Sequence, residues 1–429
     1  MSQTHNSRRW HRLDNTANLF PVITSRRFTN VFRLSVTLEK PVAPDLLQQA
    51  LEGTLPLFPS FQVRMRRGLF WRYFETNPST PLVYEEDSYP CAYIDPQQNK
   101  NFLFRITYFE TRINLESFHA LTDGTGGLQF LRAICCAYLL LADPSSFTSE
   151  EQSRRWFTEH AADTEDSYVA NYKPTKKANF RIGRAYKITG ERNLLDTASV
   201  IHTYIPINPL LALCHEKQVS VTQYLTACIF WGLYTQRLQK KPSRHPVNLF
   251  LPVNLRNLFP STTMLNFFSN IYISIAFGKT EITFEDVLAE VKQQFTTKIT
   301  NEAMLEKISY TVGSGYSPWI RAVPLPIKNM ALRIIFESSV HSSTLGFSNL
   351  GIAQMPVPFR KHVRGFSFLL SSAPREPFKA SAISYGDLLC FSFTSLLRKP
   401  DLQCAIIRHL ASQGLDIVVE TNGVDYESL

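Results

Sequence analysis

Strand-like and helix-like segments alternate through both halves of the chain, and this alternation restricts the fold more than any other feature. Short runs rich in branched and aromatic residues stand next to longer stretches with apolar residues at helical spacing. Such a mixture favours sheets covered by helices. Between about Ser149 and Asn193 the sequence turns polar and loses its periodicity. We therefore expect an α/β protein of two lobes, each a mixed β-sheet covered by helices, with an N-terminal lobe over 1–160, an interlobe crossover over 161–195 and a C-terminal lobe over 196–429.

Proline residues and capping patterns set the limits of the individual elements. Pro44 starts one helix and Pro144 stops another, while Ser220 and Gln223 have the spacing of a capping box. The expected helices are Asp45 to Leu55, Leu128 to Leu141, Ser220 to Leu238, Phe284 to Thr297 and Asp401 to Ser412. The expected strands are Phe61 to Met65, Leu69 to Phe74, Phe102 to Phe109, Ile113 to Phe118, Val247 to Val253, Ala382 to Tyr385, Leu388 to Phe393 and Leu415 to Glu420.

The composition is that of a globular protein. The chain has 429 residues, of which 44% are apolar and 19% charged, so it is neither a disordered tail nor a fibrous repeat. The longest apolar run, Ala133 to Ala142, is about half of the roughly 20 residues that a membrane-spanning helix needs. The amino terminus is polar and basic without a following apolar stretch. We expect neither a transmembrane segment nor a secretion signal.

The cysteines indicate a reducing compartment. Their number is odd, and no two of them form a CxxC pair. The seven are Cys91, Cys135, Cys136, Cys214, Cys228, Cys390 and Cys404. Such a set suits buried thiols better than a disulfide framework or a zinc site. We therefore expect a cytoplasmic protein.

The chain is basic, but its charge is dispersed. Lysine and arginine outnumber aspartate and glutamate by 45 to 36, which gives a net charge of +9. The short basic clusters are Arg26 with Arg27, and Arg64 with Arg66 and Arg67. Two interpretations stay open, namely solvated strand faces or a surface that favours an anionic ligand. No helix-turn-helix, zinc-finger or RNP-type pattern accompanies the charge, so nucleic acid is not an expected partner.

One short segment, His119 to Gly124, combines features of a catalytic site. His119 follows an expected strand, and Asp123 stands four residues later, at a glycine-rich turn that leads into a helix. A general base needs a fixed geometry, because proton transfer works only within hydrogen-bond reach of the substrate. A tight bend at a strand end can supply that geometry. The alternative is a structural histidine that happens to precede a turn aspartate, and the spacing alone leaves both open.

Other chemistries fit this region less well. A phosphate-binding loop would continue with lysine and a hydroxyl residue, whereas Leu128 follows the glycines. The GxSxG elbow of serine hydrolases has its nearest approach at 346–350, which lacks the final glycine. A metal site would need a third ligand, and Glu116 is the only nearby residue that could join His119 and Asp123. No metal is therefore expected.

His119, Asp123 and Gly124 resemble the HxxxDG signature of the chloramphenicol acetyltransferase-like superfamily, which includes condensation domains, plant acyltransferases and bacterial alcohol acetyltransferases. In that superfamily the signature follows a strand, precedes a helix and lies in the first half of the chain, as it does here. Further segments resemble the superfamily in the same order: Leu13 to Asn15, Phe20, Pro21, Phe58, Pro59, Phe61, Arg67 to Trp71, Pro252 to Arg256, Phe259, Pro260, Asn266 to Asn270, Thr344 to Gly351 and Ser384 to Leu388. The opening segments are most similar to bacterial alcohol acetyltransferases, and the resemblance covers nearly the whole chain.

The resemblance implies a two-lobed fold with an active-site tunnel between the lobes. It makes His119 the general base that takes a proton from an acceptor hydroxyl or amine, which then attacks an acyl thioester. Asp123 would be structural and would pair with Arg256. Gly124 would let the turn bend sharply and would keep the channel open beside His119.

Two further positions and two departures complete the comparison. Ser348 matches a position where some relatives place a hydroxyl against the tetrahedral oxyanion, and Asn349 is a second polar candidate there. Phe118 stands where condensation domains usually carry a second histidine. The DFGWG motif of plant acyltransferases is missing from the sequence. Both departures favour a stand-alone enzyme of bacterial type.

The resemblance therefore implies an O-acyltransferase of the alcohol acetyltransferase kind. An acyl group, with acetyl expected, would pass from acyl-CoA to an alcohol without an acyl-enzyme and without a bound cofactor, acetyl-CoA being the co-substrate. The expected acceptor is a small alcohol or amine, and the chain is expected to be a monomer. Two alternatives stay open: a condensation-like transferase that uses the thioester of an acyl carrier protein, and a noncatalytic module that binds an acyl chain or a carrier.

Overall fold

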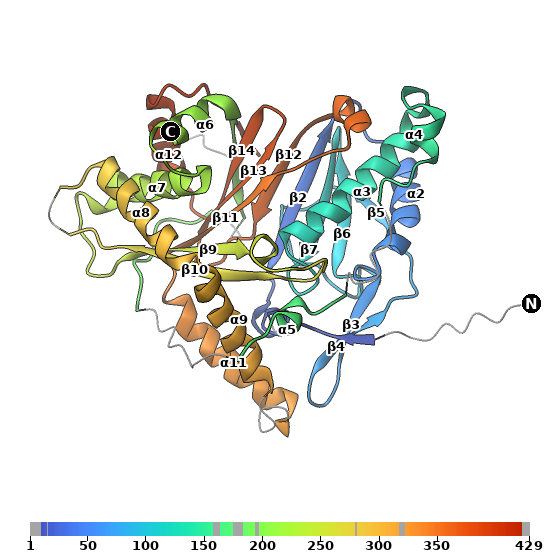
Figure 1. Ribbon diagram of the computed structural model, residues 1–429, viewed down its shortest axis with the longest axis horizontal. Helices are drawn as coiled ribbons and strands as arrows, with labels where there is room; N and C mark the ends of the chain where they lie inside the picture. The colour runs from blue at the N-terminus through green and yellow to red at the C-terminus, as the bar shows by residue number, and fades with distance from the viewer. Residues whose placement is uncertain are drawn as a thin grey trace, which may run out of the picture.

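The computed structural model describes residues 10–14, 16–157, 164–174, 183–193, 197–278, 281–316 and 322–422. Two large sheets form the centres of two lobes that stand side by side (Figure 1). Each lobe has its own cluster of buried apolar side chains. Asn15 and part of the expected crossover, 161–195, lie outside the described residues.

The sheet of the N-terminal lobe has the strand order β12-β2-β7-β6-β5. The strands are β2 (Val31–Leu38), β5 (Val83–Glu85), β6 (Phe104–Phe109), β7 (Arg112–Phe118) and β12 (Val363–Leu370). β2 and β7 run antiparallel with Val31 opposite Phe118, so the end of β7 lies beside the start of β2. Two helices, α2 (Pro44–Thr54) and α3 (Gly124–Ala142), pack on one face of this sheet (Figure 1).

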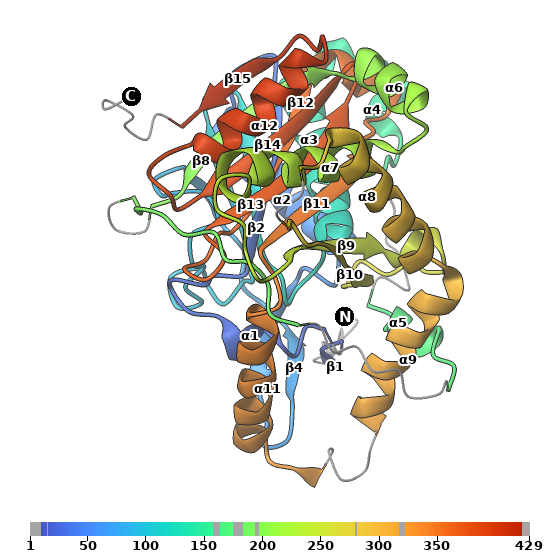
Figure 2. The ribbon, with the colours of Figure 1, turned by 90° about the vertical axis from the view of Figure 1, so that its left-hand side faces the viewer.

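The sheet of the C-terminal lobe has the strand order β10-β9-β11-β13-β14-β8-β15. The strands are β8 (Ser199–Pro206), β9 (Val247–Asn254), β10 (Phe268–Ile275), β11 (Leu345–Ile352), β13 (Phe378–Tyr385), β14 (Leu388–Ser395) and β15 (Val418–Thr421). β11 is parallel to both of its neighbours, so the sheet is mixed. Figure 2 shows the covering helices in front of these strands, namely α6 (Ile207–Glu216), α7 (Val221–Leu233), α8 (Phe284–Lys298) and α12 (Asp401–Ser412).

β12 joins the two halves of the chain. It follows β11 in sequence but pairs with β2, with Phe368 opposite Leu34 and Leu370 opposite Phe32. The N-terminal sheet is therefore completed by residues from far along the chain, and the two sheets do not divide at one point of the sequence. The two lobes of mixed sheet and helix confirm the predicted α/β class and architecture.

Smaller elements accompany the two large sheets. A three-stranded sheet has the order β1-β4-β3, with β1 (Trp10–Arg12), β3 (Val63–Arg67) and β4 (Arg72–Thr76). The remaining α-helices among the described residues are α1 (Phe20–Ile23), α4 (Ser149–Ser153), α5 (Ser167–Ala170), α9 (Asn301–Tyr316) and α11 (Leu325–Val340). α9 and α11 extend beyond the sheets at the lower edge of Figures 1 and 2.

Most local predictions are confirmed. The predicted helix over Asp401 to Ser412 has the same bounds in the structure, and Ser220 with Gln223 forms the expected capping box. The predicted helix from Ser220 to Leu238 forms as α7 up to Leu233 and continues as a π-helical turn, Tyr234–Leu238. The strands predicted in these three regions form and pair as the antiparallel hairpins β3–β4, β6–β7 and β13–β14.

The sequence patterns did not predict two long helices, α9 and α11. α9 contains two glycines, Gly313 and Gly315, which weaken the helical signal. In α11 large apolar residues such as Ile327 and Met330 are exposed, so they do not mark a buried face.

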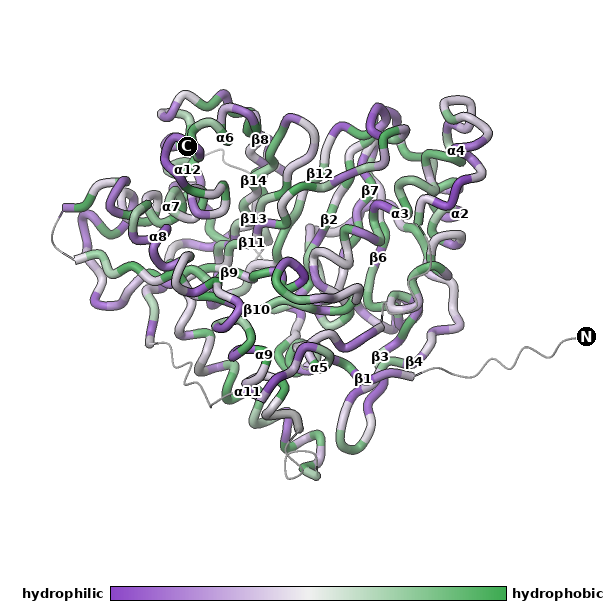
Figure 3. The backbone as a smooth tube through the Cα atoms, in the orientation of Figure 1, coloured by the Kyte–Doolittle hydropathy of each residue, from purple (hydrophilic) through white to green (hydrophobic). Residues whose placement is uncertain are grey.

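Hydrophobic residues concentrate along the central strands of both lobes, whereas hydrophilic residues mark outer loops and helix ends (Figure 3). Among the described residues, α3 is the one helix that is long and apolar enough to cross a membrane. However, 61% of its most apolar stretch is buried within the protein. α3 packs against β2 and β7, which is the position of a core helix.

A buried ion network lies on the N-terminal sheet. The fully buried carboxylate of Glu116 accepts from Arg33 Nε at 2.9 Å and from Arg105 Nε at 3.0 Å. It also accepts from the backbone N–H of Cys91 at 2.6 Å. Glu116 is therefore committed to two arginines and a loop rather than to His119. The structure shows no group of three or more metal-binding side chains within the ranges it describes.

The Glu116 network gives a first prediction. Glu116→Ala removes the buried carboxylate that Arg33 and Arg105 share, while Arg33 keeps its ion pair with Glu86. We therefore expect a loss of about 3 to 5 kcal/mol in the free energy of unfolding. Denaturant titration followed by circular dichroism measures it. Glu39→Ala is the control, because Glu39 makes an exposed pair with Arg364 and should change little. Equal effects of the two substitutions would contradict the assigned importance of the network.

Candidate active site

His119 lies directly after β7, at the point where the chain leaves the sheet. Its backbone N–H donates to the Asn30 carbonyl at 2.9 Å, which ties it to the residue before β2. Three aromatic rings surround the imidazole. Phe20 of α1 stacks on it with ring centres 4.5 Å apart, while Phe32 and Phe268 lie at 5.4 Å and 5.3 Å. The ring is thus held between α1, β2 of the first half and β10 of the second.

Asn266 fixes the tautomer of this histidine. Its amide nitrogen donates to the His119 carbonyl at 3.1 Å and to Asp14 Oδ2 at 3.2 Å. Its amide oxygen therefore faces His119 Nδ1, at 3.1 Å. Because an amide oxygen only accepts, Nδ1 must carry the proton, and Nε2 keeps its lone pair. That tautomer is the one a general base at Nε2 requires.

Asp14 holds Asn266 in place through a hydrogen bond from the Asn266 amide. Its side chain is almost completely buried, at 1% exposure, and its Oδ1 accepts from the Ala17 N–H at 2.6 Å. Burial raises the pKa of Asp14 to about 7, against the effect of its hydrogen bonds to Ala17 and Asn266. Asp14, Asn266 and His119 thus form one hydrogen-bonded series that ends at the imidazole.

The surroundings of His119 favour its neutral form. Burial of the imidazole lowers the pKa of His119 below its ordinary value of 6.5, and this effect exceeds the opposing influence of Asp123 and Asn266. His119 as a whole residue has intermediate exposure. At neutral pH the imidazole of His119 is therefore unprotonated.

Asp123 does not bond to the imidazole. Its Oδ1 caps α3 by accepting from Thr125 N–H at 3.1 Å and Gly126 N–H at 3.0 Å. Its Oδ2 accepts from Arg256 Nη1 at 2.7 Å and from the Phe267 N–H at 2.9 Å. The ion pair with Arg256 that the resemblance implied is present, and Asp123 positions the helix start and the Asn266 segment together.

Arg256 completes this connection. Its guanidinium also donates to the carbonyls of Leu265 at 2.6 Å and Thr263 at 3.1 Å. The segment that carries Asn266 is therefore held on both sides of that residue. Because Asn266 orients His119, the geometry of the imidazole depends on contacts between the two halves of the chain.

The glycines of the turn serve close packing. Gly124 does not have a positive φ, so the expected sharp bend is not what requires glycine there. A methyl group at Gly124 would instead press against the Leu350 side chain of β11, and one at Gly126 would collide with the Met264 carbonyl. The turn can thus approach the C-terminal lobe closely because Gly124 and Gly126 have no side chains.

The two predicted oxyanion residues lie on β11. Ser348 is buried, at 7% exposure, and stands opposite Ser381 of β13. The Asn349 amide nitrogen donates to Thr222 Oγ1 at 3.0 Å, and its oxygen accepts from the Gly351 N–H at 2.9 Å. Asn349 is thus engaged within the C-terminal lobe, while Leu350 on the same strand covers Gly124. The oxyanion role of Ser348 and Asn349 stays a prediction.

Sequence reasoning missed the two residues that orient His119. Asn266 and Asp14 fell within segments that resemble the superfamily, but nothing in those segments assigned them a role. A carboxylate near the start of the chain and an amide shortly before β10 carry no catalytic signal by themselves. Only the fold brings them together.

Comparisons with known proteins show which solved structures have a similar fold. No protein-family model matches the sequence, and no curated protein sequence matches it. Among solved structures, the polyketide synthase associated protein 5 from Mycobacterium tuberculosis is similar with a TM-score of 0.59 and 12% identity, over 94% of this chain and 97% of that one. A trichothecene 15-O-acetyltransferase from Fusarium sporotrichioides has a TM-score of 0.59 and 10% identity, over 94% of both chains.

A third similar structure is a mutant of the starter condensation domain of rhizomide synthetase, solved in complex with C8-CoA. Its TM-score is 0.57 at 12% identity, over 94% of both chains. The match extends over nearly the whole length in all three cases. The protein therefore has the two-lobed chloramphenicol acetyltransferase-like fold that its sequence resembles.

The close contact at Gly126 gives a second prediction. Gly126→Ala should lower the free energy of unfolding by roughly 1 to 3 kcal/mol, because the methyl group forces the Met264 backbone away. Gly53→Ala is the matched control, since Gly53 also lies in a helix but has open space around its Cα. That control should be neutral or stabilising by up to about 1 kcal/mol. Thermal or denaturant unfolding of both variants measures the difference, and a neutral Gly126→Ala would refute the close contact.

Proposed function

We propose that this protein is an acyltransferase that moves an acyl group from acyl-CoA to the hydroxyl of an alcohol, with His119 as the general base. The observation that carries this proposal is the hydrogen bond between His119 Nδ1 and the Asn266 amide oxygen, which leaves Nε2 free to accept a proton. The neutral state that burial favours adds to it. An acetyl group is the proposed acyl unit.

The reaction follows from the position of the lone pair on His119 Nε2. Nε2 accepts the acceptor's hydroxyl proton while the oxygen attacks the thioester carbonyl. The resulting tetrahedral oxyanion would be stabilised by a donor such as Ser348, with Asn349 as the second candidate. When the intermediate collapses, the C–S bond breaks and the imidazolium returns its proton to the CoA thiolate. No residue is acylated, because both substrates meet in one ternary complex.

The aromatic rings around His119 support this proton cycle. Phe20, Phe32 and Phe268 exclude water from the ring and disfavour the imidazolium. A transient cation in such surroundings gives up its proton readily. We propose that acyl-CoA and the acceptor enter from opposite faces of a tunnel between the lobes and meet at His119.

The similar structures support acyl transfer as the general reaction. One is a trichothecene 15-O-acetyltransferase, and another was solved with C8-CoA. We accordingly propose CoA thioesters as co-substrates, with no bound cofactor and a small alcohol or amine as acceptor. A cytoplasmic location is proposed from the free cysteines, six of which are buried. A monomer is the proposed assembly.

A carrier-protein donor is the second candidate. The similar structures include condensation domains, which favours an acyl or peptidyl carrier as the source of the thioester. His119 would act in the same way in that reaction. A noncatalytic binding module is less well supported, since the ordered series from Asp14 to His119 would serve no purpose in it.

Loss of the base gives a third prediction. His119→Ala should reduce kcat by about 10² or more, because no other group replaces Nε2. Release of free thiol from acetyl-CoA, measured against a panel of alcohols and amines, tests it. His245→Ala is the control, because His245 is exposed in a loop and should keep full activity. Acceptor-dependent turnover that survives in His119→Ala would contradict the mechanism, and a folded wild type that releases no thiol from short or long acyl-CoAs would contradict the CoA donor.

The pH profile gives a fourth prediction. Since His119 must be unprotonated to act, kcat/KM should rise with pH, and its midpoint should lie below 6.5 because burial lowers the pKa of His119. Asp14 titrates near 7 in the same hydrogen-bonded series. Asp14→Asn removes that titration, and the His119 step should remain. A midpoint at or above 6.5 in this variant would contradict a buried neutral base.

A further inference from the structure

The short helix α5 of the interlobe crossover packs against the segment that carries Asn266. The hydroxyls of Ser167 in α5 and Ser261 share a hydrogen bond at 2.8 Å. The hydroxyl of Thr263 donates to the Glu165 carbonyl, just before α5, at 2.7 Å. The crossover is therefore bonded to this segment at two places shortly before the chain reaches Asn266.

The hydroxyl of Tyr168, in the same helix, makes three hydrogen bonds. It donates to the Phe268 carbonyl at 2.7 Å, accepts from the Phe268 N–H at 3.1 Å and accepts from the Thr16 hydroxyl at 3.2 Å. A phenol hydroxyl has one proton to donate, and the Phe268 carbonyl takes it. Because β10 is an edge strand, the Tyr168 hydroxyl occupies the place that a neighbouring strand would have beside Phe268.

These bonds reach both ends of the hydrogen-bonded series that orients His119. Phe268 follows Asn266 by two residues, and its ring centre lies 5.3 Å from that of the imidazole. Thr16 follows Asp14 by two residues, in the turn whose carboxylate accepts from the Asn266 amide. A single hydroxyl is thus bonded to the two segments whose spacing decides whether the Asn266 amide reaches Asp14 and His119 together.

Tyr168 is itself held firmly. Its side chain is buried, at 2% exposure, and its ring packs edge-on against Phe267 with ring centres 5.2 Å apart. Asp166 caps α5 by accepting from the Tyr168 N–H at 3.1 Å. Burial raises the pKa of Tyr168, so the hydroxyl keeps its proton at neutral pH. It is therefore a fixed, neutral donor.

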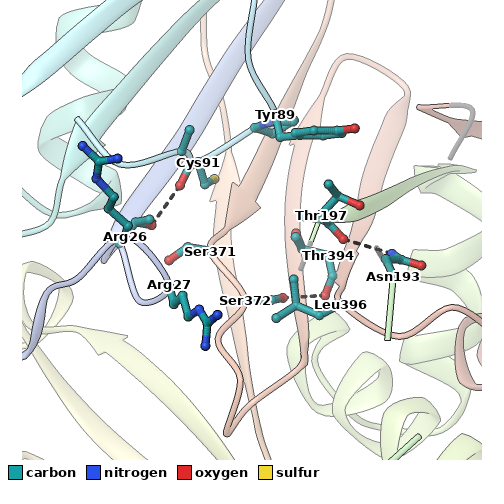
Figure 4. A pocket seen from close by; sticks show the side chains of 14 residues that line it. Arg26, Arg27, Tyr89, Cys91, Asn193, Thr197, Ser371, Ser372, Thr394 and Leu396 are labelled. Carbon is teal, nitrogen blue, oxygen red and sulfur yellow. Dashed lines mark hydrogen bonds between the residues drawn. The ribbon is translucent and has the colours of Figure 1, made fainter. Parts of the chain in front are cut away.

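The pocket in Figure 4 is separate from these contacts. Its volume is about 450 Å³, and its lining includes Ser372, whose hydroxyl donates to the Thr394 carbonyl at 2.8 Å. Within the described part of the chain, His119, Asn266 and Tyr168 do not line it. Ser372 therefore carries a hydroxyl that is bonded to a backbone carbonyl, as in Tyr168, but lies outside the series that orients His119.

We propose that Tyr168 is a positioning residue for the transfer reaction: its hydroxyl keeps the Asp14 turn and the Asn266 segment at the spacing that places the proton on His119 Nδ1. This inference rests on the proposed function, because it concerns the base of the same reaction. Tyr168 acts through Asn266 and does not need to touch either substrate. The crossover thereby takes part in setting the geometry of the base.

Tyr168→Phe in the full chain tests this role, because it removes the hydroxyl and keeps the ring with its contact to Phe267. We expect kcat to fall about tenfold to a hundredfold with little change in KM, since the base is displaced while the substrates still bind. Thiol release from acetyl-CoA measures both constants. Nitrogen-15 NMR of histidine-labelled Tyr168→Phe should show part of His119 with its proton on Nε2 instead of Nδ1.

Tyr138→Phe is the matched control. Tyr138 is also buried, and its hydroxyl accepts from the Ala43 N–H at 2.9 Å and donates to the Pro41 carbonyl at 3.4 Å. It lies near the C-terminal end of α3, the end remote from His119. Both tyrosine variants should unfold at a lower temperature than wild type, but Tyr138→Phe should keep wild-type kcat and the His119 tautomer. Ser372→Ala should also leave the tautomer unchanged.

Thr16→Val tests the same hydroxyl from its other partner. It removes one of the three bonds and leaves Tyr168 in place, so it provides a milder variant should Tyr168→Phe fail to fold. We expect kcat to fall about twofold to tenfold, with a smaller shift of the tautomer. In the double variant, Thr16→Val should add nothing to Tyr168→Phe, because the shared bond is already lost. Independent, additive losses would contradict the shared role.

Wild-type kcat in Tyr168→Phe would overturn the proposal, as would a loss of kcat with the His119 proton still on Nδ1. Failure of this inference is distinguishable from failure of the proposed function, because the NMR measurement does not depend on turnover. If thiol release requires His119 but Tyr168→Phe is fully active, the function stands and the positioning role is wrong. If Tyr168→Phe shifts the tautomer but wild type acylates no acceptor, Tyr168 still orients His119 and the function is wrong.

Discussion

The geometry of the site depends on the hydrogen bonds and the ion pair that the Asp123 carboxylate makes. One of its oxygens caps α3, and the other holds Arg256 and the backbone of Phe267. The start of α3 and the segment from Arg256 to Phe267, which are distant in sequence, therefore share one buried anion. Removing the charge would leave the Arg256 guanidinium without its carboxylate partner and would release the segment next to Asn266. Asp123, which does not bond to the imidazole, thereby controls the geometry of His119.

The electrostatics of the site follow from this arrangement. Asp123 keeps its charge away from the imidazole by directing both oxygens to other donors, and Asp14 is separated from it by the neutral amide of Asn266. His119 is thus oriented by hydrogen bonds without a carboxylate at Nδ1 that would strongly stabilise its protonated form. The aromatic rings of Phe20, Phe32 and Phe268 that pack against the imidazole act in the same direction. The result is a histidine that is held firmly and remains neutral.

Local sequence was enough to predict the parts of the site that depend on neighbouring residues. The strand end, the glycine-rich turn and the capped helix around His119 lie within one continuous stretch, and the resemblance supplied Arg256. The orienting residues could not be predicted in this way, because Asn266 lies 147 residues from His119 and Asp14 lies 252 residues from Asn266. The pairing of β12 with β2 is equally nonlocal, since either strand alone reads as an ordinary apolar run. The polar side chains of the site meet only because the fold brings together segments that are far apart in the sequence.

The central claim is that His119 is neutral and carries its proton on Nδ1, facing Asn266. Nitrogen-15 NMR of histidine-labelled protein measures this directly, with the His119 signals assigned from a His119→Gln variant. We expect a protonated Nδ1 and an unprotonated Nε2 at neutral pH. In Asn266→Ala, His119 should no longer prefer the tautomer with the proton on Nδ1. A proton on Nε2, or an imidazolium at neutral pH, would contradict it.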